Sequence, residues 1–239
     1  MTFSKDVFQD KRALVTGATQ GIGAAIANRL AALGAHVTAV GLDHGDGSLD
    51  PGVQVRTADV SRGQDIDTLF QDIGELDIVV NCAGIIRRGA EHDPAVFEQV
   101  LAVNLTGTMR VCTAARERLK PRSGCIVNIA SMLSFFGGSL VPAYSASKGG
   151  VAQLTKSLAL AYAVDGIRVN AVAPGWIATP LTQALQDDPT RSGPILSRTP
   201  LGRWGTPKDV AEAVAFLCTP AAAFMTGVIL PVDGGYLVA

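Results

Sequence analysis

Residues 13–23 read ALVTGATQGIG, and this stretch decides the fold. Its first four residues have the apolar, β-branched pattern of a short buried strand, and the residues from Gly21 to Leu33 carry apolar side chains at helical spacing. Glycine between a strand and a helix allows a sharp turn and lets backbone N–H groups approach a pyrophosphate. The positive end of the helix dipole favours the same anion. The stretch therefore predicts a nucleotide-binding turn that contains Gly17, Gly21 and Gly23.

The rest of the chain repeats this alternation of strand and helix. Short apolar runs predict further strands at His36–Val40, Val53–Thr57, Ile78–Val80, Ile126–Ile129, Val169–Val172 and Val228–Val232. Longer helical patterns lie at roughly Ala95–Arg118, Ala143–Ala163 and Lys208–Cys218. The alternation predicts an α/β fold of the Rossmann type: one domain over residues 1–239, with a doubly wound parallel sheet of about seven strands and helices on both faces.

Two segments interrupt the alternation. Residues 42–52 are rich in glycine and aspartate, and they are too polar for the helix that the pattern would otherwise place there. Residues 174–207 contain several prolines and glycines and are too long for an ordinary connection. We therefore expect a substrate loop or lid near residues 180–207.

Composition excludes several classes of protein. Hydrophobic residues make up 48% and charged residues 17% of the chain, which excludes a disordered protein. The net charge of −1 predicts no nucleic-acid partner, and the apolar runs are too short to cross a membrane. The charged N-terminus and four scattered cysteines predict a cytoplasmic protein with reduced thiols. Three histidines without a metal-binding spacing predict no metal site and no Ser-His-Asp triad.

A tyrosine and a lysine at helical spacing carry the candidate chemistry. Tyr144 and Lys148 are four residues apart, which puts them on one face of a helix. A nearby ammonium stabilises a phenolate, so Lys148 is expected to lower the pKa of Tyr144 from its ordinary value of about 10. Ser131 lies 13 residues before Tyr144, just after a predicted strand, where a hydroxyl can hold a carbonyl oxygen. The three residues predict proton transfer to or from a substrate oxygen.

These motifs together resemble the short-chain dehydrogenase/reductase family. The glycine loop has its TGxxxGxG form, residues 144–148 its YxxxK, residues 104–107 its NxxG and residues 174–179 its PGxIxT. Residues 81–84 match its NNAG, with Cys82 in place of the second asparagine. The resemblance implies hydride exchange between a nicotinamide cofactor and a secondary alcohol or ketone. It implies a catalytic set of Asn104, Ser131, Tyr144 and Lys148, in which Asn104 completes a proton relay.

The same resemblance implies a set of residues around the cofactor. They are Gly17, Thr19, Gln20, Gly21, Ile22, Gly23, Asp59, Val60, Asn81, Ala83, Gly84, Tyr144, Lys148, Pro174, Gly175, Ile177 and Thr179.

The choice between NAD and NADP depends on the end of the second predicted strand. The acidic residue that commonly selects NAD in this family is replaced by Gly41, and Asp43 follows two residues later. No lysine or arginine occurs between residues 34 and 55, so a 2′-phosphate finds no cationic side chain there. We therefore expect NAD, with Asp43 as the ribose ligand. The alternative is that Asp43 is a solvated turn residue and that NADP is also accepted.

The segments around the predicted substrate site resemble one subgroup of the family. AGIIRR, NIASMLSFFGG, VPAYSASK and RWG are similar to segments of dehydrogenases acting on 2-deoxy-gluconate, 2-keto-3-deoxygluconate or gluconate. A sugar acid needs a partner for its carboxylate, and arginine suits it. Arg87 and Arg88 are the first candidates and Arg191 and Arg198 the next. Ser131 and Met132 are expected to line the same site.

Other interpretations remain open at this stage. Each arginine could instead be solvated or lie between subunits. The substrate could be a 3-oxoacyl thioester on an acidic carrier, which the basic residues Arg110, Arg116, Arg118, Lys120 and Arg122 could attract. The protein could also be a non-catalytic nucleotide-binding scaffold, because fold does not dictate function. Low charge and an apolar stretch at residues 227–239 favour contacts between subunits, and the family resemblance implies a homo-oligomer that is a tetramer or a dimer.

Overall fold

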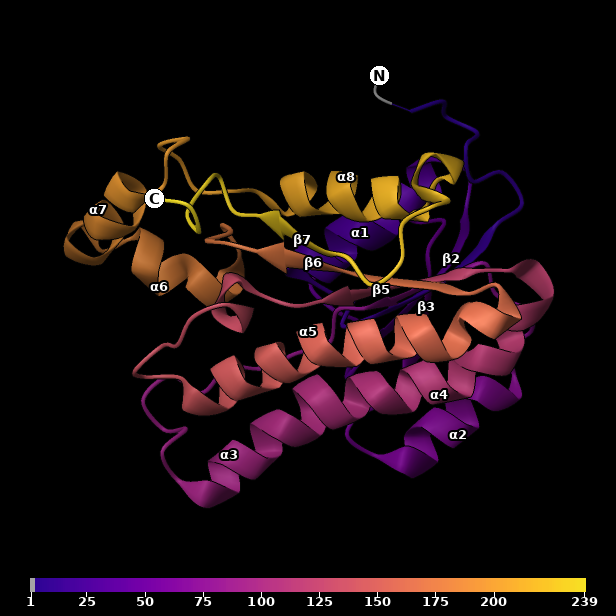
Figure 1. Cartoon of the computed structure of the whole chain (residues 1–239), viewed down its shortest axis with the longest axis horizontal. Helices are drawn as coiled ribbons and strands as arrows, with labels where there is room; N and C mark the ends of the chain where they lie inside the picture. Colours follow the sequence, from indigo (N-terminus) through magenta and orange to yellow (C-terminus); the bar gives the residue numbers. More distant parts are fainter. Residues whose placement is uncertain (1–2) are drawn as a thin grey trace.

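All the strands of the described chain lie in one parallel sheet. The computed structural model describes residues 3–239, and within them the sheet has seven strands in the order β3-β2-β1-β4-β5-β6-β7 (Figure 1). Every neighbouring pair is parallel. The predicted α/β architecture is therefore confirmed, and the expected strands agree with the observed ones to within one or two residues at each end. The strands are β1 (Arg12–Thr16), β2 (His36–Gly41), β3 (Gln54–Thr57), β4 (Ile78–Asn81), β5 (Cys125–Ile129), β6 (Arg168–Pro174) and β7 (Ile229–Val232).

The central strands are apolar throughout because both faces of the sheet are covered. All residues of β4 and β5 are buried, whereas the edge strand β3 is largely exposed. Val15, its β4 neighbour Val80 and Val127 beyond it in β5 belong to the core on one face. The residues one position earlier belong to the core on the other face. Burying each such side chain stabilises the fold by about 1.5–3 kcal/mol.

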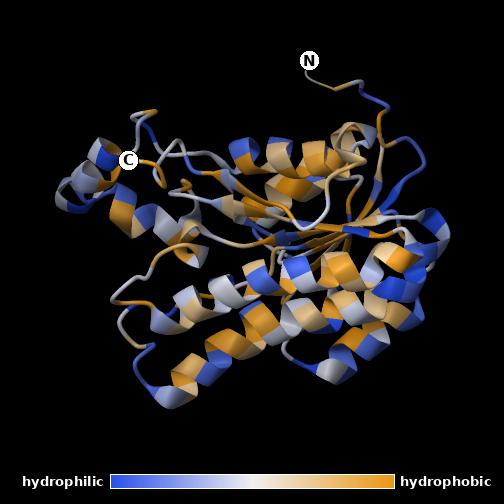
Figure 2. Cartoon of the chain, viewed as in Figure 1, coloured by the Kyte–Doolittle hydropathy of each residue, from blue (hydrophilic) through white to orange (hydrophobic). Residues whose placement is uncertain are grey.

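Two layers of helices cover the sheet (Figure 1). On one face α1 (Gly21–Ala32) packs against α8 (Pro207–Cys218). On the other face lie α2 (Gly63–Gln71), α4 (Thr108–Leu119) and α5 (Pro142–Tyr162). Figure 2 shows hydrophobic and hydrophilic residues alternating along these helices, as expected where one side faces a core.

The structure corrects three expectations about the helices. The single helix predicted at Ala95–Arg118 consists of α3 (Pro94–Leu101), a π-helical turn at Ala102–Gly107, and α4. Helix α2 was not predicted, because only three apolar side chains mark it among polar residues. The segment expected to form a substrate loop or lid contains two helices that were not predicted, α6 (Gln183–Gln186) and α7 (Pro189–Arg198), and the proline within α7 hides its helical pattern in the sequence.

The strand order reverses between β1 and β4, and this reversal positions the site. The chain crosses to opposite faces of the sheet from these two strands, which leaves a crevice at their carboxyl ends. The segments after β1, β4, β5 and β6 all meet at this edge, and they carry the predicted motifs. Within residues 3–239, no helix is long and apolar enough to span a membrane.

Candidate active site

The glycine loop makes close backbone contacts that leave no room for side chains. Gly17 has a φ of +61°, and a β-carbon added there would lie 2.5 Å from the Cα of Ala83. A β-carbon at Gly23 would lie 2.0 Å from the carbonyl oxygen of Gly17. These contacts bring the segment after β4 against the loop between β1 and α1. The loop thus forms a narrow backbone cradle at the start of a helix, which fits a pyrophosphate.

The segment after β6 lies beside the same loop. A β-carbon at Gly21 would meet the side chain of Thr179 at 3.9 Å. Ile177 is buried, and a β-carbon at Gly175 would lie 2.7 Å from the Cα of Asp233, so the backbone here is tightly packed. Residues from three separate segments therefore surround one cradle, and they fit a dinucleotide of the nicotinamide type.

The Thr19 side chain explains why β2 ends with a glycine, at the place where the cofactor ribose is expected. Thr19 occupies the space next to Gly41, where a β-carbon would lie 2.4 Å from the threonine hydroxyl. An acidic side chain cannot occupy position 41 without moving Thr19. Asp43 is exposed, and its carboxylate accepts the N–H of Gly45 at 2.9 Å in a tight turn. Gly45 also packs against the backbone of Thr19, so the polar segment folds back onto the glycine loop.

Asp59 and Val60, two residues of the predicted cofactor set, occupy the loop after β3. The Asp59 carboxylate accepts the N–H and the hydroxyl of Ser61 at 2.9 and 2.7 Å. Val60 is buried against Gly107 of the π-helical turn, where a β-carbon would lie 2.8 Å from Val60 Cγ2. This contact explains the glycine of the NxxG motif.

Asn81 lies at the end of β4, below the glycine loop. Its side chain is 3% exposed and donates to Asn128 Oδ1 at 2.9 Å and to Cys112 Sγ at 3.2 Å. Asn128 in turn donates to Thr155 Oγ1 at 2.9 Å. The amide therefore belongs to a buried chain of hydrogen bonds that ties β4 and β5 to α5.

The structure brings Ser131, Tyr144 and Lys148 together at the carboxyl edge of β5. Lys148 is buried, and its Nζ donates to the carbonyl oxygen of Ile129 at 2.6 Å and lies 5.6 Å from the centre of the Tyr144 ring. Ser131 is also buried and hydrogen-bonds to the Tyr144 phenol. The hydroxyl, the phenol and the amine thus face one small region next to the glycine cradle.

Burial dominates the electrostatics of this group. Burial raises the pKa of Tyr144 to about 12, the Ser131 hydrogen bond opposes the rise, and Cys82 and Glu91 add to it. Burial also lowers the pKa of Lys148 to about 8. The expected lowering of the Tyr144 pKa by Lys148 is not found in the protein alone, because burial is the dominant cause of the shift.

Asn104 lies in the π-helical turn and is fully buried. Its Oδ1 accepts the N–H of Ile85 at 2.8 Å, and its Nδ2 donates to the Ile85 carbonyl at 2.9 Å and to Ser147 Oγ at 3.0 Å. A β-carbon at Gly84 would lie 3.4 Å from Asn104 Oδ1 and 3.6 Å from Lys148 Nζ. The turn therefore places Asn104 beside both the lysine and the segment that follows β4.

Two serines that support the site were not predicted. Ser147 lies inside the YSASK stretch and donates its hydroxyl to the carbonyl of Tyr144 at 2.7 Å. Ser134 donates to the carbonyl of Lys148 at 2.7 Å and accepts the N–H of Ser131 at 3.3 Å. The only sequence signal for Ser134 is its place three residues after Ser131, which is the spacing of a capping box.

The substrate candidates differ in their surroundings. Arg87, Arg88 and Arg191 are exposed, and Met132 is buried. Arg198 is also exposed, and its guanidinium lies beside the stacked rings of Phe136 and Tyr236, 5.4 and 4.3 Å from their centres. A cavity of about 560 Å³ adjoins this region and is lined by Trp176, Ile177 and residues of the segments 200–209 and 231–238.

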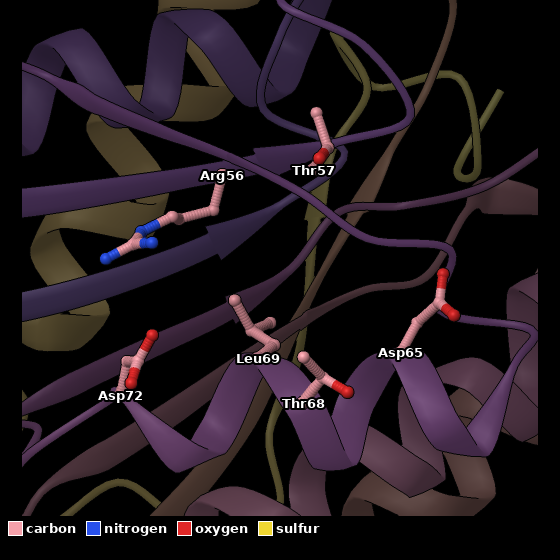
Figure 3. A pocket seen from close by; sticks show the side chains of 6 residues that line it. All are labelled: Arg56, Thr57, Asp65, Thr68, Leu69 and Asp72. Carbon is pink, nitrogen blue, oxygen red and sulfur yellow. The ribbon is translucent and has the colours of Figure 1, made fainter.

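Another hollow of about 310 Å³ lies away from the motifs, between β3 and α2. Figure 3 shows its lining, in which Arg56 comes from β3 and the aspartates from α2 and its end. It contains none of the predicted site residues. Among residues 3–239, no group of three His, Cys, Asp or Glu side chains could hold a metal ion.

Known proteins resemble the chain over its whole length. A family model described as enoyl-(acyl carrier protein) reductase matches residues 17–237. The 2-dehydro-3-deoxy-D-gluconate 5-dehydrogenase of Bacillus subtilis (strain 168) is 42% identical, with 99% of each chain covered. The cis-4-hydroxycyclohexanecarboxylate dehydrogenase of Sinomonas cyclohexanicum is 41% identical, over 97% of this chain and 98% of that one. A crystal structure of a 2-deoxy-D-gluconate 3-dehydrogenase from Agrobacterium tumefaciens with bound NADP is 42% identical, with a TM-score of 0.92 and 99% and 100% coverage.

The chain therefore belongs to the short-chain dehydrogenase/reductase family. It is an NAD(P)-dependent oxidoreductase of the alcohol dehydrogenase and ketoreductase kind. This result sets aside the hypothesis of a non-catalytic scaffold.

The buried lysine predicts a pH-dependent cost to stability. Between about pH 8 and 10.5 the unfolded chain holds a proton on Lys148 that the folded chain has released. Replacing the amine by an apolar side chain should therefore stabilise the protein without cofactor by about 3 kcal/mol near neutral pH, a gain that shrinks as the pH rises above 8. Urea denaturation of Lys148→Met at about pH 7 and about pH 9.5 measures this.

Lys156→Met is the matched control, because Lys156 is exposed on the same helix. It should change stability little at either pH. A Lys148→Met variant that is less stable than the natural protein at neutral pH would contradict the account of burial.

Proposed function

We propose that the chain exchanges hydride between a nicotinamide cofactor and a secondary alcohol or ketone of a sugar acid. The observation that carries the proposal is the cluster of Ser131, Tyr144 and Lys148 beside the glycine cradle, in which Ser131 and Lys148 are buried and Tyr144 is partly buried. A phenol, an amine and a hydroxyl that lie together in this way are suited to moving one proton to or from a substrate oxygen.

Each residue of the cluster has a distinct role in the proposal. Tyr144 donates its proton to the substrate oxygen in reduction and removes it in oxidation. Ser131 donates a hydrogen bond to the same oxygen and so stabilises the charge that develops there. Lys148 holds the cofactor ribose and supplies positive charge near the phenol, and Asn104 supports the relay of protons from Lys148 to solvent.

The cofactor is held by the residues around the glycine cradle. Gly17, Gly21 and Gly23 leave their backbone open to the pyrophosphate, and Ile177 and Thr179 lie where they can bind the carboxamide. When bound, the nicotinamide gives or takes the hydride at C4. The chain's own residues exclude water from the reacting carbon and fix its oxygen.

A sugar acid is the favoured class of substrate for two reasons. Relatives of known name act on 2-dehydro-3-deoxy-D-gluconate or on a hydroxycyclohexanecarboxylate, and both compounds carry a carboxylate. Arginines are also available near the site: Arg87 and Arg88 lie on the segment after β4, and Arg198 lies beside the stacked rings of Phe136 and Tyr236. Guanidinium suits a carboxylate because it can donate two parallel hydrogen bonds.

A 3-oxoacyl thioester has less support as the substrate. The basic residues that could attract an acidic carrier are engaged within the chain. Arg116 and Lys120 pair with Asp165, Arg122 pairs with Glu75, and Arg110 and Arg118 donate to backbone carbonyls.

NAD is the cofactor that we propose is preferred, with NADP as the alternative. The absence of lysine and arginine between residues 34 and 55 and the position of Asp43 after Gly41 support NAD. Bound NADP in the related crystal structure points the other way. Measuring kcat/KM for NAD and for NADP with the same substrate distinguishes the two preferences.

We also propose a cytoplasmic homo-oligomer, a tetramer or a dimer, in keeping with four free cysteines. The apolar side chains of Leu160, Val164 and Phe224 are more than 80% exposed. Exposed apolar side chains of this size support the proposed contact with a second subunit.

Turnover of a small panel tests the proposed function. The panel contains 2-deoxy-D-gluconate, D-gluconate and a simple secondary alcohol with NAD and with NADP, and 2-keto-3-deoxygluconate in both directions. We expect selective turnover of a sugar acid, with a higher kcat/KM for NAD. Turnover of the simple secondary alcohol alone would contradict the sugar-acid proposal, and a higher kcat/KM for NADP would contradict the cofactor proposal.

Arginine variants test the carboxylate anchor. Arg87, Arg88 and Arg198 are each replaced by alanine. The variant that lacks the anchor should have a KM for the sugar acid about ten- to a hundredfold higher, because a charged hydrogen bond is lost. Turnover of a neutral secondary alcohol should not change. Arg122→Ala, whose guanidinium pairs with Glu75 on an exposed surface, is the control. Unchanged KM in all three variants would show that none of them binds the carboxylate.

A further inference from the structure

Glu91 is a buried carboxylate that none of the sequence motifs contains. Glu91 is 1% exposed, and each of its two carboxylate oxygens accepts one backbone N–H. Oε1 accepts the N–H of Arg87 at 2.7 Å, and Oε2 accepts the N–H of Tyr144 at 2.8 Å. The ion pairs found within residues 3–239 do not include Glu91. Burying a carboxylate without a cation is costly, so its contacts need a reason.

The first reason lies in the start of helix α5. The residue before the helix is Val141, which has no side chain that could cap it, and Pro142 has no N–H. Tyr144 is the third residue of the helix, so its N–H has no partner within the helix. The carboxylate of Glu91, which lies 53 residues earlier in the chain, accepts the hydrogen bond from this N–H. Its negative charge also lies at the positive end of the helix dipole of α5.

The second reason is the segment that carries Arg87. Further contacts hold this segment against the residues that lead into α5. Gly89 donates to the carbonyl of Leu140 at 2.8 Å, and His92 Nε2 lies 2.9 Å from the carbonyl oxygen of Ser139. In Figure 1, the segments that precede α3 and α5 meet at the same end of the molecule. Glu91 is buried where these two segments meet, and it hydrogen-bonds to both of them.

We propose that Glu91 is a positioning residue that fixes Tyr144 and the Arg87 segment relative to each other. The backbone nitrogens of the two residues bind opposite oxygens of one carboxylate, so their separation is set by a single rigid group. Glu91 thereby fixes the backbone of the residue that exchanges a proton with the substrate relative to the segment that carries Arg87, one of the three candidate anchors of the substrate carboxylate. The inference rests on the proposed function, which makes Tyr144 the proton donor and Arg87 a candidate anchor.

Glu91→Gln is the most informative substitution because it keeps the shape of the side chain. A glutamine has one acceptor oxygen, and its NH₂ group faces one of the two N–H groups as a donor. One of the two contacts is therefore lost, and Tyr144 and Arg87 are no longer held to one group. Glu91→Asp keeps two acceptor oxygens and the charge on a side chain that is one methylene shorter.

Asp93→Ala is the matched control. Asp93 lies on the same segment, and its carboxylate accepts the N–H groups of Ala95 and Val96 at the start of α3. The control therefore removes a carboxylate that caps a neighbouring helix without touching Tyr144 or Arg87.

The experiment measures kcat and KM with the sugar acid that the natural enzyme turns over fastest. Thermal melting and NADH fluorescence titration are recorded for each variant. For Glu91→Gln we expect kcat to fall and KM to rise, with kcat/KM lower on the order of ten- to a hundredfold and NADH affinity unchanged. Glu91→Asp should recover part of the loss. Asp93→Ala should lower the melting temperature and leave kcat and KM unchanged.

The outcomes separate the inference from the proposed function. A folded Glu91→Gln variant with the kcat and KM of the natural enzyme would overturn the inference alone. If Glu91→Gln does not fold, Glu91→Asp decides: natural kcat and KM in a folded Glu91→Asp variant with a lower melting temperature would indicate a purely structural role. A natural enzyme that turns over no sugar acid would overturn the proposed function and with it the carboxylate half of the inference.

Discussion

The hydrogen bond from Lys148 Nζ to the carbonyl oxygen of Ile129 fixes the catalytic helix against the sheet. Ile129 is the last residue of β5, and Lys148 lies one turn after Tyr144 on α5. Together with the buried hydrogen bond from Asn128 on β5 to Thr155 on α5, this contact sets where the phenol lies relative to the carboxyl edge of the sheet. It also removes an amine from water without an acidic partner within residues 3–239, which is why burial lowers the pKa of Lys148 to about 8. Such a cost is typical of a functional site.

Small residues and hydroxyl groups make the rest of the site fit around that contact. Gly17 allows the segment after β4 to reach the glycine loop, and Gly84 leaves room beside Lys148 and Asn104. Ser147 and Ser134 bind the carbonyl groups of Tyr144 and Lys148, so the first turns of α5 are held on their carbonyl side as well. The backbone of the catalytic helix is thus fixed before any ligand binds, which is what positioning a proton-transfer group requires.

The sequence was sufficient for the architecture and for the main motifs. Continuous apolar strands alternating with helices predict a parallel sheet, and the spacing of the Tyr144 and Lys148 pair predicts their common face. What the sequence could not predict depends on contacts between distant segments. The raised pKa of Tyr144 comes mainly from burial, which is a property of the whole fold. Asn81 faces the interior because Asn128 lies next to it across the sheet, a pairing that no local pattern reveals.

Tyr144→Phe tests the central claim most directly, because it removes one oxygen atom and leaves the ring. Turnover of the sugar acid and NADH binding by fluorescence would be measured side by side in the natural enzyme and the variant. The account predicts that turnover falls by at least about a hundredfold to ten-thousandfold while NADH binds with unchanged affinity. Turnover that persists near the natural rate would show that Tyr144 does not transfer the proton and would contradict the account.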